Sequence, residues 1–238
     1  MTSKHHLEPE NNDQTRQWRA HWLSFGAWWV LLMSGYVYVA GILCQRQNPF
    51  ESGNSGAREI VLLTLLSPLL YLLGPRHNWQ SDAHSAVAIL KWNGACYLLP
   101  FFTVLHWEFL GDAIGAQFSL KPADLSSLSP RSLAVLVVAT MAIVSILTSH
   151  LFWARREGIL YPYASALFGI LFLIAVITII LSKTHYIHVH HYCLGAFLFP
   201  FFRFRNVLSL AAQAVFLGLL VEGISRWGMD PLWYPAVS

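Results

Sequence analysis

Charged residues are scarce in this 238-residue chain. Asp, Glu, Lys and Arg make up 11% of it, whereas a typical soluble domain contains about 25%. Hydrophobic residues reach 55%, and the mean hydropathy is +0.49. So small a share of charge excludes an ordinary water-soluble domain and indicates an integral membrane protein. The net charge of +3 comes from scattered basic residues, which argues against nucleic-acid binding.

Cysteine is also rare. Cys44, Cys96 and Cys193 lie far apart in apolar surroundings, which excludes a disulfide framework and a CxxC zinc knuckle. The first 20 residues are polar and lack the basic start and short apolar core of a cleavable signal peptide. We expect residues 1–20 to form a polar tail, residues 21–232 a single transmembrane domain, and residues 233–238 a C-terminal tail.

Long apolar runs recur along the chain, near the length needed to cross about 30 Å of hydrocarbon. They lack the two-residue alternation of a β-barrel, and in lipid the backbone must form its hydrogen bonds internally, so we predict helices. The fold class is therefore all-α: a polytopic transmembrane bundle of about seven spans, within a range of six to eight. The predicted spans are 22–44, 59–74, 94–111, 132–154, 162–182, 189–202 and 206–225. Nine basic residues fall on the N-terminal side of such a bundle and six on the opposite side, which favours a cytosolic N-terminus.

Four histidines occur within seven positions in the stretch THYIHVHHYCLG, residues 184–195. If this stretch is helical, His188 and His191 share a face; if it is extended, His188 and His190 share a side instead. Neutral imidazole binds zinc, iron and copper. The cluster therefore suits a metal or haem site, a hydrogen-bonded polar collar, or proton handling near the usual histidine pKa of about 6.5.

Glu222 in the last span is the predicted neighbour of these histidines. The sixth and seventh spans are antiparallel, so the far end of the seventh should lie beside the start of the sixth. The candidate metal ligands are accordingly His188, His190, His191 and Glu222, with zinc, iron or haem as the candidate cofactor. In the alternative interpretation, Glu222 only accepts a histidine N–H or pairs with Arg226, four residues further on.

Ionisable residues at two other places need an explanation, because charge inside a bilayer is costly. Glu108 and Asp112 lie one helical turn apart, which suits a cation site or a pairing of Glu108 with a lysine or arginine. His150 stands beside two arginines and is interpreted as an interfacial residue.

The C-terminal run from His188 to Leu232, HVHHYCLGAFLFPFFRFRNVLSLAAQAVFLGLLVEGISRWGMDPL, has an ordered set of elements. A histidine-rich helix start is followed by a proline, a polar turn, a glutamine and a glycine-rich finish. It resembles the C-terminal membrane region, about 185–232 here, of fungal LCCL-domain membrane proteins and related eukaryotic multi-pass proteins; the LCCL domain itself is absent. The matching residues are His190, His191, Pro200, Arg205, Ser209, Gln213, Gly218, Gly223, Arg226, Trp227 and Gly228.

The resemblance implies a shared helical unit without an assigned activity, in a eukaryotic endomembrane or plasma membrane. Three functions stay open at this point. The first is a non-catalytic scaffold or accessory protein that contacts membrane lipids and forms homo- or hetero-oligomers through its transmembrane helices. The second is a membrane-embedded metal- or haem-dependent hydrolase or oxidoreductase. The sequence thus leaves open whether the chain is an enzyme. The third is a proton-coupled transporter.

Overall fold

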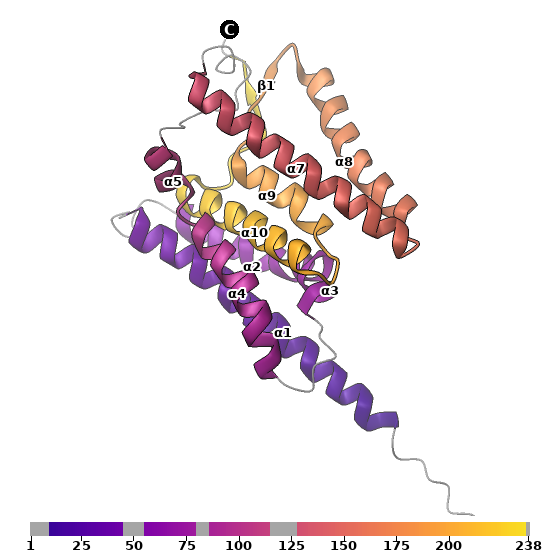
Figure 1. The fold of residues 1–238 in the computed structure, drawn as a ribbon. Helices are drawn as coiled ribbons and strands as arrows, with labels where there is room; N and C mark the ends of the chain where they lie inside the picture. The colour runs from indigo at the N-terminus through magenta and orange to yellow at the C-terminus, as the bar shows by residue number, and fades with distance from the viewer. Residues whose placement is uncertain (1–9, 45–54, 80–85, 115–127, 237–238) are drawn as a thin grey trace, which may run out of the picture.

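The computed structural model describes residues 10–44, 55–79, 86–114 and 128–236, and almost all of them are helical (Figure 1). The first half comprises α1 (Glu10–Tyr38) with its π-helical extension η1 (Val39–Leu43), α2 (Ser55–Leu73), α3 (Pro75–Trp79), α4 (Ala86–Val104) and α5 (Trp107–Ile114). The second half comprises α7 (Pro130–Arg156), α8 (Leu160–Leu181), β1 (His185–Ile187), α9 (His191–Leu198), the 3-10 turn η2 (Phe199–Phe201), α10 (Val207–Trp227) and β2 (Trp233–Pro235). The predicted all-α fold class is confirmed.

Each of the seven predicted spans overlaps helical residues, although the span 94–111 joins the end of α4 to α5 across a break at residues 105–106. Among the described residues, five segments are long and apolar enough to cross a bilayer: Trp18–Leu43, Gly56–Leu73, Pro130–Arg156, Leu160–Leu181 and Val207–Trp227. Two apolar segments are shorter, Gly94–Val104 and His191–Phe201. Eight residues of α helix rise only about 12 Å, so α9 cannot cross the hydrocarbon by itself. It ends just before Pro200, which has no N–H to continue the helix.

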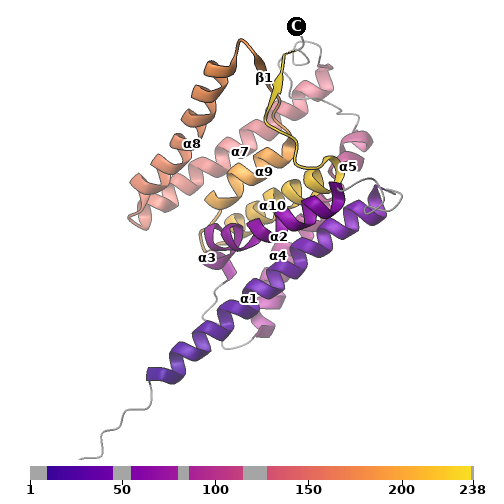
Figure 2. The same cartoon turned by 180° about the vertical axis from the view of Figure 1, so that it is seen from behind.

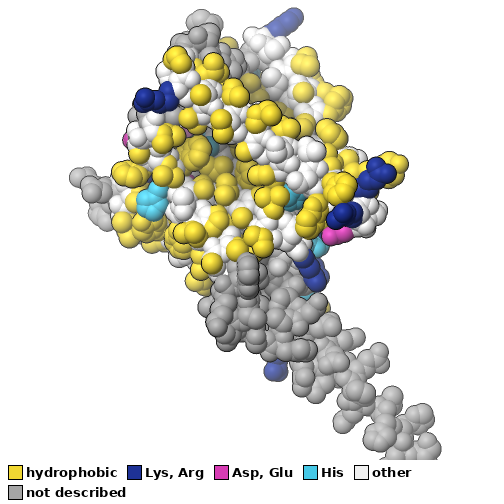
Figure 3. Space-filling view, in the orientation of Figure 1, with side chains coloured by type: hydrophobic (Ala, Val, Ile, Leu, Met, Phe, Trp, Pro, Cys, Tyr) yellow, Lys and Arg dark blue, Asp and Glu magenta, His cyan; other side chains and the backbone are white. Residues whose placement is uncertain are grey.

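Helix α10 lies at the centre of the bundle, in contact with α4 and α9 and also with α1, α2 and α7 (Figures 1 and 2). Within its most apolar window 78% of the residues are buried, compared with 6% in α7 and in α8. The outer faces of α7 and α8 are therefore exposed and apolar, as surfaces that meet lipid should be. Figure 3 shows hydrophobic side chains across one face of the molecule, with Lys and Arg toward its edges.

Side chains from the preceding loops cap the first turns of two long helices, α7 and α10. The Asn206 Oδ1 atom accepts the Ser209 N–H at 2.8 Å, and the Ser129 hydroxyl accepts the Ser132 N–H at 3.1 Å, with Pro130 directly after this cap. Such caps satisfy backbone donors that have no partner inside the helix. They set the first residues of α10 and α7.

Glycine allows two helices to approach the backbone of α10. A Cβ atom on Gly195 would lie 2.6 Å from the Phe216 carbonyl oxygen, and one on Gly218 would lie 3.0 Å from the Phe101 carbonyl oxygen. In lipid, close backbone approach replaces the hydrophobic effect as a source of helix association. Gly218 therefore allows α4 to pack closely against α10.

The two ends of the proposed transmembrane domain differ from the expected tails. Helix α1 begins at Glu10, inside the expected polar tail, and residues 1–9 and 237–238 lie outside the described residues. Residues 233–235 form β2, which pairs antiparallel with β1 in the register His185 to Pro235 and Ile187 to Trp233. This small sheet holds the C-terminal segment against the histidine-rich stretch.

Candidate functional site

The histidine-rich stretch changes conformation at His191. Residues 185–187 form β1, residues 188–190 stay extended, and α9 begins at His191 with His190 at its N-cap, where φ is −72° and ψ is 148°. The extended conformation, in which His188 and His190 were predicted to share a side, is therefore the one found. Their rings lie side by side, with centroids 4.0 Å apart.

His188 and His190 face the C-terminal strand. His190 Nε2 shares a hydrogen bond of 3.1 Å with the Tyr234 hydroxyl, and the His190 ring stacks on Tyr192 at 5.5 Å. The His188 ring also contacts Tyr234, at 5.6 Å. Burial raises the pKa of Tyr234 to about 12, so its hydroxyl keeps its proton at neutral pH. These two histidines thus belong to an aromatic cluster that joins the start of α9 to β2.

His191 points to the opposite side, toward α10. Its Nε2 atom lies 2.6 Å from Glu222 Oε2, and because a carboxylate only accepts, the imidazole donates. The other carboxylate oxygen, Oε1, accepts the Arg226 Nε–H at 2.8 Å. Arg226 also forms an ion pair with Glu108 of α5. We call these four residues, His191, Glu222, Arg226 and Glu108, the charge network.

The charge network runs from the protein interior to its surface. The Glu222 side chain has no exposed area, those of Arg226 and His191 are 17% and 24% exposed, and that of Glu108 is 45% exposed. Both oxygens of the most buried carboxylate are therefore occupied by donors from the chain itself. The predicted proximity of Glu222 to the histidine stretch is confirmed for His191, and so is its pairing with Arg226.

The four predicted metal ligands fall into two separate pairs. His191 binds Glu222, whereas His188 and His190 contact each other and Tyr234. In the part of the chain that the structure describes, no three His, Cys, Asp or Glu side chains are grouped so that they could hold a metal ion. The geometry therefore favours hydrogen bonding for this cluster, while its metal binding stays a prediction.

A second set of buried polar groups surrounds the start of α10. His150, expected at the interface, is instead 2% exposed; its Nε2 atom lies 2.9 Å from the Ser209 hydroxyl and its Nδ1 atom 2.7 Å from the Ile146 carbonyl oxygen. Asn78 and Gln213 both donate to the Phe202 carbonyl oxygen, at 2.9 and 2.8 Å. The sequence did not indicate this burial, because it comes from the packing of α7 against α10 and against Phe202 and Phe204 of the preceding loop.

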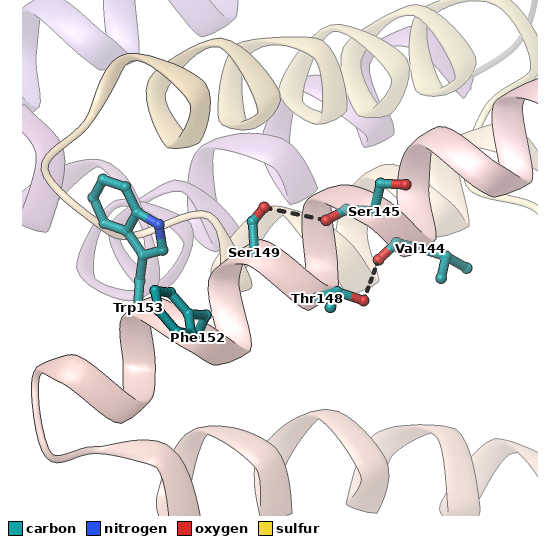
Figure 4. Close-up of a pocket in the computed structure, with 6 residues that line it drawn as sticks. All are labelled: Val144, Ser145, Thr148, Ser149, Phe152 and Trp153. Carbon is teal, nitrogen blue, oxygen red and sulfur yellow. Dashed lines mark hydrogen bonds between the residues drawn. The ribbon is translucent and has the colours of Figure 1, made fainter.

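A shallow groove follows the outer side of α7 (Figure 4). It is lined by Val144, Ser145, Thr148, Ser149, Phe152 and Trp153, all from this one helix. The Thr148 and Ser149 hydroxyls donate to carbonyl oxygens one turn earlier, at 2.8 and 3.2 Å. The groove contains no titratable side chain, so it offers neither an acid–base pair nor a metal ligand set.

The helices and the buried charge together define a class: the chain is an integral membrane protein, in which the described residues include five helices able to cross a bilayer, α10 at the centre among them. No protein-family model, curated protein or solved structure matches the chain. What the protein does must therefore be argued from its own residues.

Proposed function

We propose that this chain is a non-catalytic multi-pass membrane protein, a scaffold or accessory, in which the histidine-rich stretch fastens α9 and the C-terminus to α10. The observation that supports this best is the closed charge network. Glu222 is fully buried, and its two oxygens are bound by His191 and Arg226. A carboxylate that ligates a metal or accepts a substrate proton must be open to that partner, whereas the Glu222 side chain has no exposed area.

The buried residues between Gln213 and Glu222 argue against a proton path along α10. Between Gln213 and Glu222 the buried residues of this helix are apolar, including Phe216, Leu217 and Leu220. Proton transfer across a membrane uses chains of titratable groups. The two polar regions of α10 are instead separated by about 13 Å of helix, since nine residues rise 1.5 Å each.

The remaining expectations are part of the same proposal. The exposed faces of α7 and α8 would contact lipid, or helices of the same or another protein in a homo- or hetero-oligomer. The resemblance of residues 185–232 to fungal LCCL-domain membrane proteins supports a eukaryotic endomembrane or plasma membrane as the location. The excess of basic residues on the N-terminal side supports a cytosolic N-terminus.

Metal and chromophore content tests the proposal. The protein would be purified in detergent, and bound metal and the haem-region absorbance would be recorded for the wild type, His190→Ala and His191→Ala. We expect far less than one metal ion per chain and no haem band in all three. One zinc or iron ion per chain that is lost in either variant would refute the non-catalytic role.

A measurement of proton flux distinguishes the proposed non-catalytic role from proton-coupled transport. Wild-type protein and Glu222→Gln would be reconstituted in vesicles that contain a pH-sensitive dye, and an inward pH gradient would be applied. We expect both to match protein-free vesicles. Flux in the wild type that disappears in Glu222→Gln would overturn the proposal in favour of transport.

A further inference from the structure

Three arginines converge on His77 at the end of the molecule that holds α3 and the loop before α10. Arg205 donates its Nε–H to the His77 carbonyl oxygen at 3.2 Å, and the Arg203 guanidinium lies 3.4 Å from His77 Nδ1. Arg76 is the preceding residue of α3. Burial lowers the pKa of His77, and the charges of Arg203, Arg76 and Arg205 lower it further. All three cations thus act on one imidazole, which stays neutral and can accept the Arg203 hydrogen bond.

This basic cluster, Arg76, Arg203 and Arg205, is held in place by buried hydrogen bonds. The Asn78 and Gln213 amides fix the carbonyl oxygen of Phe202, the residue before Arg203. Asn78 is 8% exposed and Gln213 is fully buried. The loop that carries two of the arginines is therefore anchored both to α3 and to α10, which keeps the positive charges together despite their repulsion.

The basic cluster lies where the hydrocarbon layer should end. Arg76 follows Leu73, the last residue of a candidate span, by three positions, and Arg205 precedes Val207, the first residue of another, by two. Exposed apolar side chains border it on both helices: Leu69, Leu72 and Leu73 on α2, and Val207 and Leu208 on α10. The arginines thus have exposed apolar side chains next to them on the side of the hydrocarbon layer. This arrangement suits a ligand that combines an anionic group with acyl chains. A free phosphate ion would use only the cations.

We propose that the basic cluster binds the phosphate of an anionic phospholipid, whose acyl chains lie along the exposed ends of α2 and α10. Guanidinium groups suit this ligand because their planar donors bind phosphate oxygens two at a time. On a cytosolic membrane face, anionic lipids and basic residues also attract each other through the surface potential. The site depends on the chain spanning a membrane, and it is independent of the proposed non-catalytic role.

Lipid titration of the full chain tests this site. Purified protein in neutral detergent would be titrated with phosphatidylserine, with phosphatidylcholine and with inorganic phosphate, and binding would be measured by native mass spectrometry and by the melting temperature. The test variant is Arg76→Gln with Arg203→Gln. Arg205 stays, because it holds the His77 carbonyl oxygen. The matched control is Arg155→Gln with Arg156→Gln at the end of α7, which changes the net charge by the same amount.

We expect phosphatidylserine to bind more tightly than phosphatidylcholine, and the test variant to bind it about 25-fold more weakly, at about fivefold for each arginine. The control should keep wild-type affinity. Arg76→Gln alone, which changes an exposed side chain, should weaken binding about fivefold and covers the case in which the double variant does not fold. Equal weakening in test and control, equal affinity for both lipids, or a response to inorganic phosphate as large as to phosphatidylserine would each overturn the proposal.

Discussion

Replacing Glu222 by Gln should destabilise the protein strongly, because it breaks the charge network at its most buried point. The amide has the shape of the carboxylate but presents an NH2 donor in place of one oxygen. The NH2 group then faces either the Arg226 Nε–H, which can only donate, or His191, whose proton must move to Nδ1 before Nε2 can accept. Arg226 also loses its buried counter-ion, and the carboxylate of Glu108, which still pairs with it, is 45% exposed.

The expected loss follows from burial. Removing one partner of a buried ion pair costs about 3–5 kcal/mol, because the other charge is left without compensation. Arg226 is 17% exposed, so water can reach part of it, and we take the lower end, about 3 kcal/mol. At about 2–4 °C for each kcal/mol in a protein of this size, the melting temperature should fall by about 6–12 °C.

The assay is thermal unfolding in detergent, followed by intrinsic tryptophan fluorescence, with two companion variants. Glu108→Gln removes the exposed carboxylate of the same network and should cost less than about 1 kcal/mol. Glu222→Leu combined with Arg226→Met removes both buried charges and should be less destabilised than Glu222→Gln, since well-packed apolar residues can replace a buried ion pair. If Glu222→Gln melts within 2 °C of the wild type, or no lower than Glu108→Gln, the charge network does not stabilise the fold and the reasoning fails.

Two further predictions use the same melting assay. Gly195→Ala should lower the free energy of unfolding by about 1–3 kcal/mol, because the new Cβ atom would lie 2.6 Å from a backbone oxygen of α10. The control Gly169→Ala should leave it unchanged, because nothing lies within 4 Å of that position. Equal effects of the two variants would show that α9 and α10 are not in close contact. The pKa of His77 is lowered in the folded state, so the unfolded chain binds its proton more tightly, and the stability it contributes is present above pH 6.5 and lost as the pH falls from there toward the folded pKa. His77→Gln should therefore lose less stability than the wild type between about pH 7.5 and pH 5, and an identical loss would contradict the lowered pKa.

Local sequence signals predicted most of the fold. Within the described residues, hydropathy located the five long apolar segments and the two shorter ones, because each depends on a continuous apolar run and not on distant residues. The neighbourhood of Glu222 and His191 was also predictable, since a short connection forces α9 and α10 to run antiparallel and counting residues along them gives the register. Chain direction and helical rise were sufficient to bring together two groups 31 residues apart.

The rest depended on contacts that leave no local pattern. β1 and β2 have three residues each, too few for a strand alternation to be recognised, and the Tyr234 side chain that meets His190 lies 44 residues away. A site of four metal ligands requires His188, His190 and His191 to converge on one point with Glu222. The structure instead begins α9 at His191, so the extended backbone and the helix direct the imidazoles to different partners.

The polar residues of α10 specify which segments pack around it. In a bilayer, lipid tails are as apolar as leucine side chains, so burying leucine does not distinguish one helix pairing from another. Three buried polar side chains of α10 instead have partners from different segments: Ser209 meets His150 of α7, Gln213 meets the carbonyl of the loop after η2, and Glu222 meets His191 of α9. An alternative pairing would leave such a group unsatisfied in an apolar environment, which costs several kcal/mol. The polar residues that first suggested a reaction centre thus account for the arrangement of the helices, and this is why stability measurements on Glu222 bear directly on function.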